Sequence, residues 1–207
     1  DAAWAAIGGQ PAILEGFVNF AHEFSVILCR GQDGSIVDWP VPVNLHKGGI
    51  LATSTLPPPA LVRAQAAEAV QLARTVAEKL GHIGVLTAEF FACKDGPRFN
   101  EIAPRVHNSG HWTIEGSATS QFENHVRAVV GLPLRPTALM SSRIEMTNLI
   151  GDDVADWPRL MADPTAHVHL YGKAEARPGR KMGHVCVMAD STAEALVVIE
   201  RIRAGLG

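Results

Sequence analysis

The sequence predicts an α+β protein in which a mixed or antiparallel β-sheet is flanked by helices. Residues 24–29 form a short run that is almost continuously apolar, as in a buried strand. Residues 60–80 place apolar side chains at helical spacing. Residues 83–103 contain two β-type runs separated by Lys94, Asp95 and Gly96, which is the pattern of a hairpin. We expect a smaller β-rich subdomain to follow this central region.

The composition is that of a globular chain with a sizeable core. Of its 207 residues 47% are hydrophobic and 19% charged, and no apolar run reaches the roughly 18 residues that a membrane span needs. The net charge of -3 includes no long block of like charge. We therefore expect neither nucleic acid nor a membrane as a partner, and any anion site must be local.

Three cysteines, Cys29, Cys93 and Cys186, are widely spaced and form no CxxC pair. They predict neither a disulfide framework nor a zinc knuckle, and they fit a reducing, cytoplasmic environment. The first ten residues lack the charged start and apolar stretch of a signal peptide. They resemble the interior of a longer sequence.

Several elements follow in order along the chain. Residues 13–30 predict two strands separated by residues 19–22. The helix at 60–80 ends before Gly81, which suits a left-handed C-terminal stop. Residues 120–123 and 191–194 both match the capping box, so a helix is expected to begin at Ser120 and another at Ser191. Residues 133–137 are the best internal linker.

The hairpin carries two acidic residues, Glu89 and Glu101. A three-residue loop at 94–96 pairs Cys93 with Pro97 and therefore Glu89 with Glu101, whereas a two-residue Asp-Gly loop places Glu89 opposite Ile102. Directly opposed carboxylates repel each other unless a cation lies between them. Hard oxygen ligands favour Mg²⁺ or Mn²⁺.

The alternative is that both glutamates simply face solvent. Their expected neighbours argue against it, because both sets are mainly apolar. Val85, Thr87 and Phe91 are expected on the face of Glu89, and Phe99 and Ala103 on that of Glu101. This composition favours the metal hypothesis.

Residues 100–111 (NEIAPRVHNSGH) gather cationic and amide side chains directly after a strand. Such donors suit a carboxylate, phosphate or bicarbonate. His107 and His111 are four residues apart, a spacing that suits zinc on a helix, but the intervening Asn-Ser-Gly is poor helix and the stretch has no third soft ligand. An ordinary polar loop is the remaining alternative.

Residues 171–184 place four basic side chains around a Pro-Gly turn. Such clusters usually cover a solvated surface, but the glycines here permit close approach of a ligand. The separated cations suit a sugar phosphate. Nucleic acid is a weaker hypothesis, because the chain is acidic and lacks interleaved stacking aromatics.

Four motifs, at residues 100–113, 120–123, 148–151 and 177–181, together resemble the 5-(carboxyamino)imidazole ribonucleotide synthase family. The resemblance covers nearly the whole chain. It implies the C-terminal half of an ATP-grasp ligase that uses ATP and bicarbonate to carboxylate 5-aminoimidazole ribonucleotide through carboxyphosphate, in purine biosynthesis. It also implies Mg²⁺ or Mn²⁺ as cofactor and a homodimer.

The resemblance assigns roles to individual residues. It implies ATP contacts from Glu15, Gly16, Phe17, Val18, Glu23, His46, Asn100 and Glu101, and metal ligation by Glu89 and Glu101. It implies substrate binding by Arg105, His107, Asn108, Ser109, Lys173, Arg180 and Lys181, with Arg105 and Lys173 also catalytic. Many ATP-grasp relatives carry an asparagine two residues after the second metal carboxylate. This chain has Ala103 there, as the motif of the resembled family implies.

Family members begin with an N-terminal domain and a lid whose lysines reach the phosphates, and this chain resembles them from the end of that lid, near Gly8. The resemblance therefore implies a fragment that is inactive in isolation. It divides the chain into residues 1–14, the end of the lid and the hinge, residues 15–135, the nucleotide- and metal-binding domain, and residues 136–207, the subdomain that binds the ribonucleotide.

Two other functions stay open. Another ATP-grasp ligase, such as a formate-using purine enzyme or a biotin-carboxylase-like protein, would keep Glu89 and Glu101 but need a different loop after Glu101. A non-catalytic binding domain would lack Mg²⁺-dependent affinity for ATP or ADP, so nucleotide titration separates it from a ligase.

Overall fold

The computed structural model describes residues 2–190, 197, 200 and 204. Its helices and 3₁₀ segments (η) are α1 Ala2–Ala6, α2 Ala60–Lys79, η1 Asn108–Gly110, α3 Thr113–Gly116, α4 Gln121–Val129, η2 Gly151–Asp156 and α5 Trp157–Met161. Its strands are β1 His22–Arg30, β2 Ile36–Asp38, β3 Val43–Lys47, β4 Ile50–Leu56, β5 Gly84–Cys93, β6 Gly96–Ala103, β7 Arg143–Ile150, β8 Ala166–Leu170 and β9 Lys181–Ala189.

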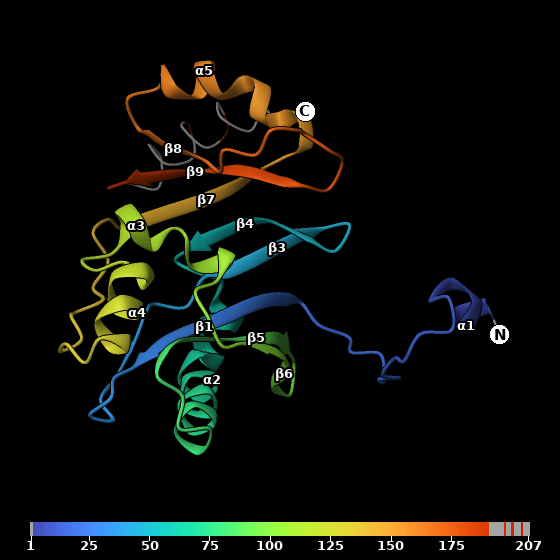
Figure 1. Ribbon diagram of the computed structural model, residues 1–207, viewed down its shortest axis with the longest axis vertical. Helices are drawn as coiled ribbons and strands as arrows, with labels where there is room; N and C mark the ends of the chain where they lie inside the picture. The colour runs from blue at the N-terminus through green and yellow to red at the C-terminus, as the bar shows by residue number, and fades with distance from the viewer. Residues whose placement is uncertain (1, 191–196, 198–199, 201–203, 205–207) are drawn as a thin grey trace.

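Within the described residues the nine strands form one sheet, and every pairing is antiparallel. The strand order is β6-β5-β1-β3-β4-β7-β9-β8 (Figure 1). Strand β2 pairs with β1 at the side of this path. Helices α2, α4 and α5 pack on the sheet, whereas α1 does not. The predicted α+β class with an antiparallel sheet flanked by helices is therefore confirmed.

Two apolar cores lie on opposite faces of strands β1 and β5, because alternate residues of a strand point to opposite sides. Helix α2 covers one face through Val62, Ala69, Ala73 and Ala77, which pack with the strand residues in one buried cluster. The segment containing α3 and α4 covers the other (Figure 1). The side chains that could carry chemistry lie beyond the edge of this second core.

Helix α2 confirms the predicted helix at 60–80. It ends at Lys79, and Gly81 follows with a positive φ of 58°, the left-handed conformation that glycine adopts without strain. Helix α4 begins where the Ser120 motif predicts, and the Ser120 hydroxyl accepts the backbone N–H of Glu123 at 3.1 Å. The motif beginning at Ser191 lies outside the described residues.

The sheet continues across the expected linker, because β7 pairs with β4. Residues 133–137 have no regular structure but are held in place. The Asn124 side chain accepts the backbone N–H of Arg135 at 2.9 Å and donates to its carbonyl at 3.0 Å. Thr137 donates to the Asp38 carbonyl at 2.6 Å. The domain boundaries after residues 14 and 135 stay predictions.

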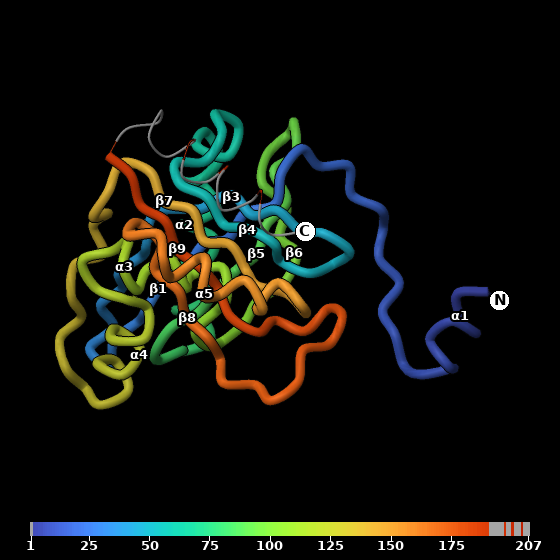
Figure 2. Tube along the Cα trace, turned by 90° about the horizontal axis from the view of Figure 1, so that it is seen from above, coloured from blue at the N-terminus to red at the C-terminus, as the bar shows by residue number. Residues whose placement is uncertain are grey.

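The first of the two strands predicted within residues 13–30 is wrong. Residues 11–20 have no regular structure and, apart from the half-buried Val18, are exposed. Figure 2 shows this part of the chain running away from the sheet towards α1. An apolar, strand-like sequence needs a neighbouring strand to satisfy its backbone. Segment 13–18 pairs with none of the described strands, and β1 begins at His22.

The β5–β6 hairpin confirms the pairing of Glu89 with Glu101 but by an unexpected route. Cys93 pairs with Gly96, so the loop has two residues, Lys94 and Asp95, and not the three predicted. A β-bulge then shifts the register between Glu89 and Phe90, leaving Asn100 as the extra residue.

The same bulge corrects the predicted neighbours of Glu101. Phe99 pairs with Phe90 and contacts its ring edge-on, with the ring centroids 5.9 Å apart. It therefore lies on the α2 face of the sheet and not on the face of Glu101, as was expected. Ala103 pairs with Thr87 and does share the face of Glu89 and Glu101.

Among the described residues, no helix combines the length and the apolar character that a membrane crossing requires.

Candidate active site

Glu89 and Glu101 occupy adjacent strands and the same face of the sheet, because they are direct cross-strand partners. Glu89 is half-buried and Glu101 is exposed. Burial raises the pKa of Glu89, but the hydrogen bond from His107 and the electrostatic effects of His107, His46 and Lys181 outweigh this effect and lower the pKa overall. Glu89 is therefore a carboxylate at neutral pH.

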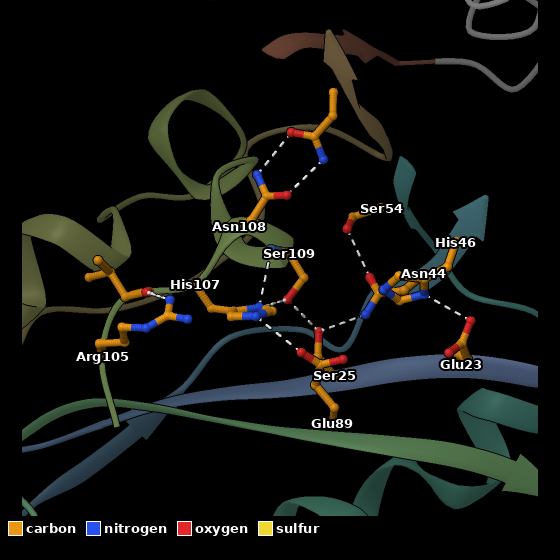
Figure 3. Close-up of polar contacts among 12 residues, drawn as sticks. Glu23, Ser25, Asn44, His46, Ser54, Glu89, Arg105, His107, Asn108 and Ser109 are labelled. Carbon is orange, nitrogen blue, oxygen red and sulfur yellow. Dashed lines mark hydrogen bonds and ion pairs between the residues drawn. The ribbon is translucent and has the colours of Figure 1, made fainter. Parts of the chain in front are cut away.

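His107 connects this carboxylate to the loop after β6. Its Nε2 lies 3.0 Å from Oε1 of Glu89, and its Nδ1 lies 2.8 Å from the Ser109 hydroxyl (Figure 3). The backbone N–H of Ser109 also points at Nδ1, at 3.3 Å, so the ring caps η1. The loop geometry and the position of the histidine are thus set by the same contacts.

Gln121, fully buried at the start of α4, holds the loop at residues 107–111. Its Oε1 accepts the His107 N–H at 2.9 Å, and its Nε2 donates to the His107 carbonyl at 2.7 Å. A β-carbon added to Gly110 would lie 2.7 Å from both Oε1 of Gln121 and Cδ1 of Ile27. A β-carbon here would displace the Gln121 amide or the Ile27 methyl group, so the close approach of loop and sheet favours glycine.

A buried chain of hydrogen bonds supports Ser109 from below (Figure 3). The Ser54 hydroxyl donates to Oδ1 of Asn44 at 2.8 Å, and Nδ2 of Asn44 donates to the Ser25 hydroxyl at 3.1 Å. The Ser25 and Ser109 hydroxyls are 2.8 Å apart. These four residues come from β4, β3, β1 and η1, and each is at most 5% exposed. A satisfied buried network of this kind fixes a single arrangement of the loop.

Two predicted ATP contacts, Glu23 and His46, contact each other. Oε2 of Glu23 lies 2.8 Å from Nδ1 of His46, across β1 and β3 (Figure 3). The register between β3 and β4 shifts at His46, as in a β-bulge. Both side chains are partly exposed, so they are accessible to a ligand.

Of the four residues predicted to form the hinge, two line a cavity. Phe17 and Val18 line a cavity of about 490 Å³ with Lys94, Asp95 and Arg98 of the hairpin. Glu15 and Gly16 are exposed and are not among its lining residues. Asn100 is the exposed bulge residue of β6.

The cations come from two segments that meet. Arg105 is exposed and donates to the Val106 carbonyl at 3.0 Å, beside His107 (Figure 3). Lys173 is exposed and donates to the Lys181 carbonyl. Burial lowers the pKa of Lys181, Glu89 raises it, and the charges of Arg105 and Lys173 lower it further, so the net direction is down. Glu89, Arg105 and Lys173 all affect the pKa of Lys181, so the four side chains belong to one electrostatic site.

Arg180 belongs to the same turn and contacts its backbone. Its guanidinium donates to the Glu175 carbonyl at 3.1 Å, within residues 171–181. It is half-buried. Arg180 therefore shapes the turn itself, and its guanidinium N–H groups that do not contact Glu175 remain available to a ligand.

The donor set fits a hard divalent cation better than zinc. Mg²⁺ is commonly held by one or two carboxylates plus substrate phosphates, which the pair Glu89 and Glu101 satisfies. The described residues contain no group of three or more His, Cys, Asp or Glu side chains suited to a metal. Nδ1 of His111, the other histidine considered for zinc, contacts Asn108 and Tyr171.

Several residues of the site were not predicted from sequence. Gln121 was noted only as part of a helix start, and Ser25, Asn44 and Ser54 were not singled out. Asn148, which contacts Asn108 through two hydrogen bonds, was noted only as part of a family motif. The available signal was a polar residue inside an otherwise apolar strand, such as Ser25 within residues 24–29.

The fold and the paired carboxylates define a class of protein. Residues 1–122 match the ATP-grasp domain model, and the chain belongs to this family. Residues 145–197 match the phosphoribosylaminoimidazole carboxylase C-terminal domain. The order of the two matches agrees with the resemblance predicted from the motifs.

Comparison with individual proteins shows which members of the family the chain is similar to. The chain is 55% identical over 188 residues to the N5-carboxyaminoimidazole ribonucleotide synthase of Brucella melitensis, covering 88% of this chain and 50% of that protein. The Thermus thermophilus N5-carboxyaminoimidazole ribonucleotide synthetase structure matches with a TM-score of 0.87 and 44% identity, over 97% of this chain and 56% of that one.

A third relative has been solved with ligands. The Aspergillus clavatus N5-carboxyaminoimidazole synthase, in complex with ADP and 5-aminoimidazole ribonucleotide, matches with a TM-score of 0.85 and 32% identity, over 92% of this chain and 52% of that one. The chain spans about half the length of the curated relatives described above. The resemblance to the N5-carboxyaminoimidazole ribonucleotide synthases is confirmed.

Proposed function

We propose that this chain takes part in the ATP- and bicarbonate-dependent carboxylation of 5-aminoimidazole ribonucleotide, a step of purine biosynthesis. The observation that carries the proposal is the grouping of Glu89, His107, Arg105 and Lys181 around one loop. A carboxylate for a metal and cations for two anions are what this chemistry requires. The relatives' names and the bound ribonucleotide of the Aspergillus protein agree with it.

The reaction proceeds in two steps. A bicarbonate oxygen attacks the γ-phosphorus of ATP, the bond to the β,γ-bridging oxygen breaks, and ADP leaves with carboxyphosphate formed. The exocyclic amine of the ribonucleotide then attacks the carboxyl carbon. The C–O bond to phosphate breaks, inorganic phosphate leaves, and the amine loses a proton. No protein nucleophile is needed.

The chain's residues bind and orient these groups. Arg105, with His107, Asn108 and Ser109, is proposed to hold bicarbonate and its carboxyl derivative, since a guanidinium suits a developing carboxyphosphate charge. Lys173, Arg180 and Lys181 are proposed to hold the ribonucleotide phosphate. The effect of Arg105 and Lys173 on the pKa of Lys181 supports placing both anions in one site.

Nucleotide binding is proposed for residues of β1, β3, β6 and the hinge. Glu23 and His46 would contact the ribose and the region of the phosphates, and their 2.8 Å contact supports a shared role. Phe17 and Val18 would contact the adenine, supported by the cavity that they line. Glu15, Gly16, Asn100 and Glu101 complete the proposed set.

Glu89 and Glu101 would hold Mg²⁺ or Mn²⁺. When bound, the cation offsets the negative charge on the transferred phosphoryl group. The resemblance alone supports two further proposals, that the enzyme is a homodimer and that it acts in the cytoplasm.

The test uses a completed enzyme, in which the part of the Brucella melitensis relative that this chain does not match is joined to this chain. ADP release should depend on bicarbonate and Mg²⁺, and carboxylated product should form when 5-aminoimidazole ribonucleotide is also present. A completed enzyme that folds and binds ATP but releases no ADP with all three would contradict the proposal. Nucleotide binding without Mg²⁺ dependence would instead indicate a binding domain.

A further inference from the structure

Two side-chain amides face each other between η1 and β7. Nδ2 of Asn148 donates to Oδ1 of Asn108 at 2.7 Å, and Nδ2 of Asn108 donates to Oδ1 of Asn148 at 2.9 Å. Figure 3 shows the two dashed contacts of Asn108. Asn148 is 3% exposed. It belongs to the part of the chain that matches the C-terminal family, whereas Asn108 belongs to the ATP-grasp part.

The orientation of this amide pair is determined by a backbone carbonyl. The ladder between β4 and β7 ends where Thr53 pairs with Thr147, and Nδ2 of Asn148 donates to the Leu51 carbonyl at 2.8 Å just beyond. A carbonyl can only accept, so Asn148 must present its NH₂ group there. Its oxygen then faces Asn108, and Asn108 must present its own NH₂ group in return.

The Asn108 amide in turn determines which ring nitrogen of His111 carries the proton. Nδ2 of Asn108 also lies 3.3 Å from Nδ1 of His111, and an amide NH₂ group donates. Burial, together with the charges of His107, Lys181 and His169, lowers the pKa of His111 to about 4. The ring is therefore neutral at pH 7, accepts at Nδ1, and carries its proton on Nε2.

Tyr171 continues the chain towards the basic residues. Its hydroxyl lies 3.0 Å from Nδ1 of His111 and 2.9 Å from Nδ1 of His184. With no proton on Nδ1 of His111, the Tyr171 hydroxyl donates there at the shorter distance and shares the single lone pair of Nδ1 with the more distant Asn108 amide; the hydroxyl oxygen accepts from His184. Two residues later, Nζ of Lys173 lies 5.6 Å from the centre of the Tyr171 ring.

We propose that Asn148 is a positioning residue: through Asn108, His111 and Tyr171 it holds the loop at 107–111 in register with the basic segment at 171–181. This inference rests on the proposed function, in which the loop binds the carboxyl donor and the segment binds the ribonucleotide phosphate. Asn148 itself touches neither anion. Its role is to orient the Asn108 amide, so that the amine and the carboxyl carbon meet at the correct distance.

The first test needs neither a variant nor enzyme activity. In the chain labelled with ¹⁵N-histidine at pH 7, long-range ¹H–¹⁵N spectra report which ring nitrogen of His111 carries the proton. We expect Nε2. A proton on Nδ1 would overturn the inference while leaving the proposed function intact.

The second test replaces Asn148 in the completed enzyme. Asn148→Leu should raise the KM for 5-aminoimidazole ribonucleotide roughly ten- to a hundredfold, because small displacements of reacting groups cost that much. ATP cleavage should exceed product formation. The matched control is Asn124→Leu. Asn124 is also a buried asparagine with two hydrogen bonds to one partner, but that partner is the Arg135 backbone, away from the loop.

A double-variant cycle separates positioning from general loss of stability. If Asn148 acts through Asn108, then Asn148→Leu should change the ribonucleotide KM little further in an Asn108→Ala background. Additive effects of the two substitutions, or an equal rise of KM in Asn124→Leu, would overturn the inference. A wild-type completed enzyme without ribonucleotide-dependent turnover would instead contradict the proposed function, and the His111 measurement would still decide the orientation.

Discussion

Nε2 of His107 lies 3.0 Å from Oε1 of Glu89, while the backbone N–H of Ser109 points at the opposite ring nitrogen from 3.3 Å. An N–H group can only donate, so Nδ1 of His107 is an acceptor and the ring proton is on Nε2. His107 thus donates to Glu89. This hydrogen bond occupies one carboxylate oxygen and leaves the other to approach a cation.

Replacing Glu89 by Gln should abolish turnover with little effect on folding. The amide keeps the size of the side chain but removes the charge, so we expect kcat/KM of the completed enzyme to fall by at least about 100-fold. Mg²⁺-dependent binding of ATP should weaken in parallel. Calorimetric titration of ATP with and without Mg²⁺ measures this directly.

Glu68→Gln is the matched control for this substitution. Glu68 lies exposed on α2, away from the loop at 107–111, so the same chemical change there should leave turnover unaltered. Normal turnover in Glu89→Gln would exclude Glu89 as a required ligand. Unfolding by urea should give similar midpoints for both variants.

Gly110→Ala should destabilise the loop. The added β-carbon would lie 2.7 Å from both Gln121 and Ile27, and overpacking of this kind typically costs about 1 to 3 kcal/mol in the free energy of unfolding. Gly16→Ala is the control, because nothing lies within 4 Å of the new β-carbon and its φ is not positive. Urea denaturation of this chain compares the two, and equal stability would show that the loop moves freely away from α4.

Local sequence patterns predicted the elements whose stability comes from neighbouring residues. Helix α2 was predicted because the spacing of its apolar residues determines its buried face and Gly81 determines where it ends. The hairpin was predicted too, but not its bulge at Asn100, since a bulge depends on packing of Phe99 against Phe90 across the sheet. Segment 13–18 failed for the same reason, because its pattern says nothing about a pairing partner.

The site was predictable only where residues are close in sequence. Arg105, His107, Asn108 and Ser109 share one motif, and the resemblance singled them out together. The hydrogen bonds that orient them come from Ser25, Asn148 and Gln121, which are between 14 and 84 residues away from the loop residues that they contact. Such contacts are a property of the folded sheet and leave no periodic signal.

Acid should destabilise the fold through His184. Burial, with smaller contributions from His111 and His169, lowers its pKa from 6.5 to about 3. Below pH 6.5 the unfolded chain therefore binds a proton that the folded chain does not, and the free energy of unfolding decreases as pH falls towards 3. Between pH 7 and pH 4.5 this single group accounts for roughly 2–3 kcal/mol.

The measurement is urea denaturation of this chain at both pH values, followed by tryptophan fluorescence. His184→Gln cannot be protonated, so its loss of stability between pH 7 and pH 4.5 should be smaller than that of the wild type. His167→Gln, on the exposed face of β8, should keep the wild-type loss. If His184→Gln and wild type lost equal stability, His184 would not be the group that titrates.

Two anions must be held together while only one of them reacts, so substitutions of Arg105 and Arg180 should have different kinetic effects. Arg105 lies beside His107, where charge develops on the carboxyl group, and Arg105→Ala should depress kcat even at saturating ribonucleotide. Arg180 lies on the turn proposed to hold the phosphate, remote from bond breaking. Arg180→Ala should therefore raise the ribonucleotide KM while bicarbonate-dependent ATP cleavage partly persists.

Steady-state kinetics of the completed enzyme, with ADP release and product formation followed separately, distinguish the two effects. Arg63→Ala is a suitable control, because Arg63 is exposed on α2 and should affect neither quantity. Removing a binding group that acts equally in the ground and transition states changes KM alone, whereas removing one that acts only in the transition state changes kcat. An unchanged ribonucleotide KM in Arg180→Ala would mean that Arg180 does not bind the ribonucleotide phosphate. A normal kcat in Arg105→Ala would mean that Arg105 does not stabilise the reacting carboxyl group.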